Sequence, residues 1–254
     1  MELKIYITIV CFFFGLIFGS FYNVVGWRIP KGLSIVKPAH SFCPKCKHKL
    51  KWYELIPVLS YLIQGGKCRA CHEKIAPFYT IIELTTGILF ALSYWMLGPS
   101  FEFLLAILTV SILSIVIVSD INFLIIPDQV TLIFSILVIM FRFICLGPVD
   151  AAYHMMYGFI AFLIMYLLML MGNFVFKRES LGGGDIKLMF YVGCAIGPWM
   201  DIFSIFLSSF IALPLSIILY FKNKNNVIAF GPFILLSCLI IILFKIDINI
   251  LFNI

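Results

Sequence analysis

The chain has 254 residues, of which 63% are hydrophobic, 17% aromatic and only 12% charged, and its mean hydropathy is +1.12. Because a soluble domain is normally about 45–50% apolar and about 25% charged, this composition excludes an ordinary soluble globular protein and indicates a polytopic membrane protein. The net charge of +6 follows from the placement of Lys and Arg around the membrane segments, and nothing in it indicates binding to nucleic acid.

Eight apolar runs reach or approach the 20 or so residues that a membrane-spanning helix needs. The sixth and eighth are the shortest. The runs cover 5–27, 78–97, 101–119, 127–146, 152–173, 186–199, 202–221 and 228–244. The sequence therefore predicts an all-α polytopic membrane protein with about eight transmembrane helices. We expect a first transmembrane helix (1–27), a small cytoplasmic loop domain (28–77) and a seven-helix membrane domain (78–254).

The first run also has features of a signal peptide, with Phe18-Gly19-Ser20 as a small-residue cleavage site. Cleavage there would export the loop that follows. That loop carries ten Lys and Arg from Arg28 to Lys74, against two Glu. Because positively charged loops stay in the cytoplasm, we favour an uncleaved first helix.

Threading eight helices with the N-terminus outside gives a clear charge asymmetry. Fifteen Lys and Arg then fall on the cytoplasmic side and three on the outer side, namely Lys4, Arg142 and Lys245. This bias predicts that the N-terminus lies outside and the basic loop in the cytoplasm. The basic loop can also contact anionic lipid headgroups.

The loop carries two C-x-x-C pairs, Cys43/Cys46 and Cys68/Cys71. Two such turns present four thiolates in the arrangement that structural zinc prefers. The alternative is two disulfides, which form in oxidising compartments. The predicted cytoplasmic location favours zinc, which would supply much of the folding free energy of a loop with little core of its own. The apolar stretch 55–63 is too short to span a membrane, and we expect it to pack over the metal site or to lie in the interface.

Two carboxylates are predicted to meet at the cytoplasmic boundary. Asp120 ends the third apolar run and Asp185 begins the sixth. Two carboxylates close together in a partly dehydrated site share a proton. One then activates water as a base while the other donates a proton to a scissile carbonyl, as in aspartic proteases.

Glycine flanks one of these acids, in SLGGGDIKL. Gly182, Gly183 and Gly184 allow close approach of a neighbouring helix or an extended substrate. The alternative is a flexible linker with Asp185 as an ordinary N-cap. Asp128 follows Pro127 and fits a first-turn acid.

Glu83 is the remaining acid of interest. It lies inside the start of the second apolar run, and an intramembrane acid is a functional candidate. We expect it to lie near the substrate.

These motifs, taken in order, resemble those of the type IV prepilin peptidase (leader peptidase/N-methyltransferase) family, one of the membrane GxGD aspartic peptidases. The resemblance is carried by FGSFYNVVGWRIP (18–30), the cysteine loop (41–75), DINFLIIPD (120–128), GGGDIKL (182–188) and FGPF (230–233). It implies that Asp120 and Asp185 are catalytic. It also implies cleavage of short basic leaders from type IV prepilins or pseudopilins, after glycine and at the cytoplasmic face.

Members of that family with the cysteine loop resemble bifunctional enzymes that also methylate the new N-terminus with S-adenosylmethionine. The resemblance therefore implies this second activity as well. No G-x-G-x-x-G motif is present to place the methyl donor. Two alternatives stay open: a peptidase that only cleaves, with the loop as a docking module, and a transporter in which the two acids form an ion relay.

Overall fold

The computed structural model describes residues 1–37, 40–43, 45–177, 182–222 and 228–246. Within these residues every regular element is a helix, and the only pairing of extended backbone is two isolated β-bridges, which confirms the predicted all-α class. The chain divides into two compact units, Met1–Pro99 and Ser100–Ile254.

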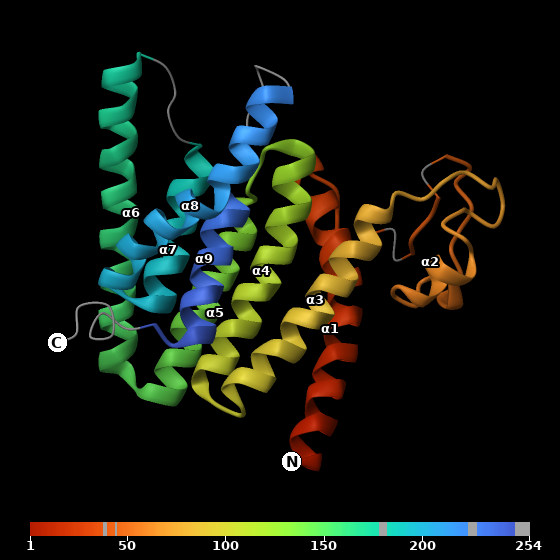
Figure 1. Ribbon diagram of the computed structural model, residues 1–254, viewed down its shortest axis with the longest axis horizontal. Helices are drawn as coiled ribbons and strands as arrows, with labels where there is room; N and C mark the ends of the chain where they lie inside the picture. The colour runs from red at the N-terminus through yellow and green to blue at the C-terminus, as the bar shows by residue number, and fades with distance from the viewer. Residues whose placement is uncertain (38–39, 44, 178–181, 223–227, 247–254) are drawn as a thin grey trace. The chain divides into compact units, whose positions relative to one another are not determined.

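In the first unit, α1 (Glu2–Arg28) and α3 (Pro77–Leu97) lie side by side (Figure 1). Glycines allow this packing. A Cβ added at Gly15 would lie 2.7 Å from Cα of Gly87, and one at Gly19 would lie 2.9 Å from Cα of Glu83. Helices in lipid associate through such small residues, because close backbone approach maximises van der Waals contact.

Short elements connect the two helices of this first unit. They are η1 (Ile29–Lys31), η2 (Trp52–Glu54) and α2 (Leu59–Ile63). Side chains from 56–62 and from α1 and α3 form an apolar groove. The stretch 55–63 therefore packs beside the helix pair.

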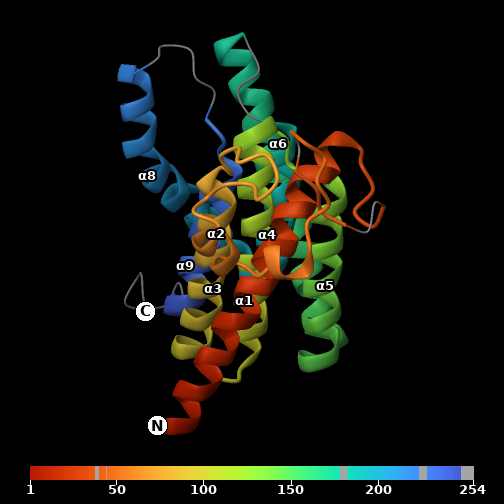
Figure 2. The ribbon, with the colours of Figure 1, turned by 90° about the vertical axis from the view of Figure 1, so that its right-hand side faces the viewer.

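The second unit is a bundle of six helices in its described residues (Figure 2). They are α4 (Phe101–Phe123), α5 (Asp128–Leu146), α6 (Pro148–Phe176), α7 (Gly183–Ile196), α8 (Pro198–Lys222) and α9 (Gly231–Phe244). Helix α4 packs against α5 and α9, and α7 contacts α5, α6, α8 and α9. The fold thus brings the C-terminal end of α4, the N-terminal end of α7 and the N-terminal end of α9 together.

Several polar side chains inside this bundle pair with neighbouring helices or with the backbone. The hydroxyls of Thr109 and Tyr191 lie 2.9 Å apart, and Ser237 donates to the carbonyl of Ser204 at 3.0 Å. The buried guanidinium of Arg142 donates to the carbonyls of Cys194 and Ala195 at the end of α7. These bonds matter because an unpaired polar group is costly where no water is present.

Each of the eight predicted apolar runs overlaps largely with one of these helices. Six helices, namely α1, α3, α4, α5, α6 and α8, are long and apolar enough to cross a membrane. Helices α7 and α9 have 14 residues each, a length of about 21 Å, which is shorter than the roughly 30 Å of a hydrocarbon core. The structure thus supports a multi-pass membrane protein with at least six apolar helices of spanning length.

Candidate active site and metal centre

Asp120 lies in the last turn of α4, where the helix ends in a backbone cap. Leu124 adopts a left-handed conformation with φ +54°, and its N–H donates to the carbonyl of Asp120 at 2.8 Å. The cap turns the chain away from the helix axis into the segment 124–127 that leads to α5. The side chain of Asp120 is buried, with 6% of the residue exposed.

Asp185 lies in the first turn of α7, three residues after the N-cap Gly182. Its N–H donates to the carbonyl of Gly182 at 3.1 Å, and 9% of the residue is exposed. The structure therefore places Asp185 at a helix N-terminus, as predicted, and overturns the alternative in which Asp185 is itself the N-cap residue.

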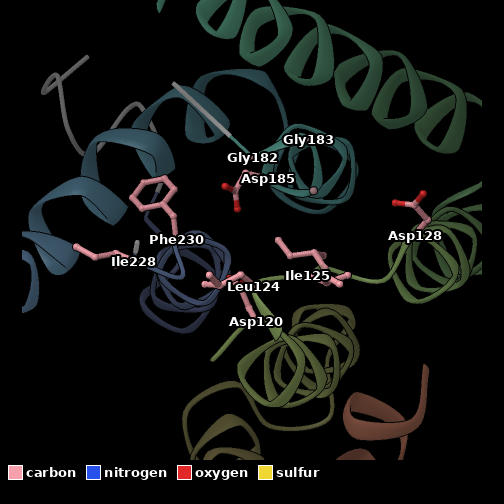
Figure 3. A pocket seen from close by; sticks show the side chains of 11 residues that line it. Asp120, Leu124, Ile125, Asp128, Gly182, Gly183, Asp185, Ile228 and Phe230 are labelled. Carbon is pink, nitrogen blue, oxygen red and sulfur yellow. The ribbon is translucent and has the colours of Figure 1, made fainter. Parts of the chain in front are cut away.

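Both aspartates line one pocket with a volume of about 310 Å³, shown in Figure 3. Because both carboxylates line this one pocket, they repel each other when both are ionised. The pocket is also lined by Gly182, Gly183 and Gly184, by Asp128, by the apolar residues Leu124, Ile125 and Ile126, and by Ile228 and Phe230.

The three glycines have different surroundings. A Cβ at Gly184 would lie 2.9 Å from Cβ of Ile126, and one at Gly182 would lie 3.2 Å from Oδ2 of Asp185. A Cβ at Gly183 would meet no atom of the described structure within 4 Å. Gly184 therefore permits close packing inside the bundle, whereas Gly183 presents open backbone at the pocket.

A fourth glycine belongs to this site and was not among the predicted site residues. A Cβ at Gly231, the first residue of α9, would lie 2.6 Å from Cδ1 of Ile126 and 3.3 Å from Oδ2 of Asp120. The sequence signal was the FGPF motif, whose glycine and proline mark a helix start. Only the fold shows that this start lies beside Asp120.

Glu83 belongs to the first unit, in α3. Its Oε2 accepts a hydrogen bond of 2.8 Å from the N–H of Val58. Val58 has φ +61° and ψ −51°, a conformation that β-branched residues rarely adopt. Glu83 thus holds a strained turn ahead of α2, and its expected place near the substrate stays a prediction.

The four loop cysteines come together in one cluster. Their sulfur atoms all lie within 4.8 Å of one another, with 3.9 Å between Cys43 and Cys71 and 4.0 Å between Cys46 and Cys68. Zinc–sulfur bonds of about 2.3 Å in a tetrahedron place the sulfurs about 3.8 Å apart. All four cysteines are free thiols, so the geometry fits a tetrahedral metal ion and not two disulfides.

The two halves of this cluster repeat the same backbone turn. Cys43 N–H donates to the carbonyl of His48, and Cys68 N–H donates to the carbonyl of Glu73, both at 2.9 Å. The backbone N–H groups of Cys46 and Lys45 lower the pKa of Cys43 to about 6. Backbone N–H groups aimed at sulfur favour thiolate, which is the form that binds metal. Lys45 and Glu73 then join the two turns through an ion pair of 2.6 Å.

Two family models match the chain. A model described as Bacterial Peptidase A24 N-terminal domain matches residues 13–97, and one described as Type IV leader peptidase family matches residues 107–217. These matches fall in the first and the second unit respectively. No solved structure matches the chain.

Proteins with assigned names align with most of this chain. A protein named prepilin leader peptidase/N-methyltransferase from Bacillus subtilis is 40% identical over 189 residues, which cover 74% of this chain and 73% of the relative. Proteins of the same name from Vibrio cholerae (35% over 209 residues, 78% and 80%) and Neisseria gonorrhoeae (31% over 252 residues, 88% and 85%) are also similar.

Proposed function

Because the chain belongs to the type IV leader peptidase family, we propose that it cleaves the basic leader from type IV prepilins or pseudopilins and methylates the new N-terminus. The observation that carries the peptidase half is the pocket in which Asp120 and Asp185 meet beside open glycine backbone. The relatives' names, which combine leader peptidase and N-methyltransferase, support both halves.

The proposed cleavage needs one proton between the two carboxylates. The ionised carboxylate takes a proton from water as the water oxygen attacks the scissile carbonyl carbon, and the protonated one donates to the carbonyl oxygen. When the tetrahedral intermediate collapses, the C–N bond breaks. The leaving amine takes the proton held by the base, and a hydroxyl of the intermediate gives its proton to the other carboxylate as the carbonyl re-forms, so the pair again holds one proton. Burial of both groups supports the sharing of a proton, because a low dielectric disfavours two charges.

The glycine segment 182–184 is the proposed binding surface for the substrate backbone. Gly183 offers backbone with free space on its Cα, so an extended peptide can approach it closely. We propose that the glycine before the scissile bond lies over Gly182–Gly184, where a larger side chain would collide with this backbone.

The proposed topology places this chemistry at the cytoplasmic face of the plasma membrane, with the N-terminus outside. Helices α1, α3, α4, α5, α6 and α8 then cross the bilayer, and the shorter α7 and α9 cross it within the bundle. This division assigns residues 1–27 to the first transmembrane helix, 28–77 to the cytoplasmic zinc loop and 78–254 to the membrane domain with the peptidase site. The charge count along the chain supports this orientation.

Two further groups are part of the proposal. Cys43, Cys46, Cys68 and Cys71 hold a structural zinc ion, which stabilises the loop and takes no part in the chemistry. S-adenosylmethionine supplies the methyl group for the new amine. The described residues form no strand–turn–helix with a glycine-rich turn, so they do not fit a dinucleotide-type site for this donor. We assign no residue to the methyl transfer.

The test is to incubate the purified enzyme in lipid with a prepilin-like peptide, with and without S-adenosylmethionine, and to weigh the products by mass spectrometry. We expect loss of the leader in both samples and one further methyl mass on the mature product when the donor is present. Leader loss without methylation would support the peptidase activity and reject the methyltransferase activity. An intact peptide in both samples would reject the proposed function.

A further inference from the structure

An ion pair lies at the edge of the pocket that holds the two aspartates. The ammonium nitrogen of Lys187 lies 2.8 Å from Oδ1 and 2.7 Å from Oδ2 of Asp128. Asp128 is the first residue of α5 and lines the pocket, whereas Lys187 follows Asp185 by two residues on α7. Both side chains are exposed, Lys187 to 51% and Asp128 to 67%. The pair thus joins the two motif segments, and Figure 3 shows the side chain of Asp128 on α5, apart from the carboxylate of Asp185.

We propose that Asp128 binds a basic side chain of the leader and that Lys187 occupies this carboxylate only while no substrate is bound. This inference rests on the proposed function and specifies how that same pocket recognises its substrate. It makes Asp128 a specificity-determining residue instead of an ordinary first-turn acid.

The other acids in the described part of the second unit are unsuited to this role. Asp120 and Asp185 are buried and belong to the proposed chemistry. Asp150 accepts a hydrogen bond of 2.9 Å from Arg142, and Asp201 is 1% exposed. Glu102 begins α4, at the opposite end of that helix from Asp120. Asp128 is therefore the exposed carboxylate that the described pocket offers to an incoming cation.

Breaking the ion pair between Lys187 and Asp128 costs little free energy. An ion pair between exposed side chains contributes at most about five-fold to an equilibrium constant, so Lys187 is readily displaced. In the wild type the leader lysine meets an ion pair with no net charge, whereas in Asp128→Asn it faces the ammonium of Lys187 alone and in Lys187→Gln it faces the carboxylate of Asp128 alone. Once displaced, Lys187 carries the same charge as the leader and opposes its binding. The proposal therefore predicts opposite effects for removing the two partners of one ion pair.

The experiment uses the full-length enzyme in nanodiscs of uncharged phosphatidylcholine, which removes the competing attraction of anionic lipid. Two prepilin-like peptides are compared, one with a lysine-containing leader and one with those lysines replaced by glutamine. For the lysine peptide, Asp128→Asn should raise KM and Kd about two- to five-fold, and Lys187→Gln should lower both. Neither variant should shift KM or Kd for the glutamine peptide, and Glu102→Gln, which removes a first-turn acid elsewhere in the unit, should change nothing.

A purely structural pair would give a different pattern. If Asp128 and Lys187 only clamp α5 to α7, both variants lower kcat to a similar extent with either peptide, and that outcome overturns the proposal. Unchanged KM and Kd in Asp128→Asn would also overturn it. Failure of the wild-type enzyme to cleave either peptide would instead count against the proposed function, while the Kd values still decide whether Asp128 reads the leader charge.

Discussion

Ile126 packs so closely on Gly231 that a β-carbon at position 231 would lie 2.6 Å from its Cδ1. This contact joins the segment after Asp120 to the first turn of α9. On its other side Ile126 meets Gly184, where a β-carbon would lie 2.9 Å from Cβ of Ile126. One isoleucine thus sets the spacing of three segments around the pocket.

Gly231→Ala should destabilise the second unit by about 1–3 kcal/mol, the usual cost of overpacking, and should reduce cleavage. Ile126→Val removes the Cδ1 atom that the new methyl group meets, so Ile126→Val/Gly231→Ala should recover much of the loss. Gly184→Ala is the matched control. Its methyl group meets Cβ of Ile126, which valine keeps, and Ile126→Val should not rescue it. Thermal unfolding in detergent measures all five proteins, and equal rescue of both alanine variants would contradict the packing described.

Asp120→Asn and Asp185→Asn should each abolish leader cleavage while leaving the protein folded. Loss of an acid–base group costs about 10²–10⁴-fold in rate. Because the two residues act as a unit, the double variant should be hardly slower than either single variant. Product formation followed by mass spectrometry measures this, with Glu102→Gln as the control for removal of a carboxylate. Full activity in either single variant would reject the catalytic pair.

The purified protein should contain about one zinc ion per chain, bound by the four loop cysteines. Cys68→Ser should lower the zinc content and expose the loop to protease, because the other three thiolates would lose their common ligand geometry. Elemental analysis and limited proteolysis measure the two effects. Intact-mass data with these cysteines paired in disulfides in the native protein would reject the metal site and its cytoplasmic location.

Glu54 should give the loop a pH dependence of its own. The backbone N–H of Lys51 donates to its carboxylate at 2.8 Å and, together with His48, lowers the pKa of Glu54 below its usual value. Because the pKa is lower in the folded state, the ionised carboxylate stabilises the fold above the unfolded pKa of about 4.3. This stabilisation is lost as the pH falls through the folded pKa. Hydrogen exchange across 48–54 should therefore rise on acidification below about pH 4. In Glu54→Gln this carboxylate-dependent step should be missing, and an identical profile in both proteins would refute the assignment.

Replacing the leader's final glycine with valine should block cleavage far more than replacing one leader lysine. The valine side chain would have to fit against the backbone of Gly182–Gly184, whereas a single exposed ionic contact is worth only about 0–1 kcal/mol. Cleavage rates at saturating peptide separate the two effects, since weaker binding no longer limits the rate there. Comparable rates for the valine and glycine peptides would show that the steric explanation is wrong.

Helix positions were largely readable from the sequence, because apolar runs of this length have few other structures open to them in a membrane. Helix ends were less so. The predicted sixth segment, 186–199, runs through a helix end at Ile196, where Gly197 turns with φ +82° before Pro198 begins α8. Hydropathy does not change across that turn, although glycine followed by proline is itself a break signal.

Site residues with a distinctive chemical group could be predicted from the sequence. Site residues whose role is to pack against another helix could not. Asp120 and Asp185 stand out as acids in apolar surroundings, and paired cysteines indicate a metal. Gly231 and Ile126 are ordinary residues until α9 is placed against the end of α4. Arg142 was counted among the charges of the outer side, yet it is 5% exposed and donates to two carbonyls of α7. Contacts between distant segments of this kind require the fold.

The glycine contacts between α1 and α3 also bear on how such a chain can evolve. Because Gly15 and Gly19 seat the two helices directly against each other, the pair has an interface of its own besides its contacts with the residues that connect it. The connecting segment, with its cysteines, is then a module inserted between two helices that already recognise each other. A lineage that lost or exchanged the cysteine-bearing part of this module would keep the glycine contacts that hold the two helices together.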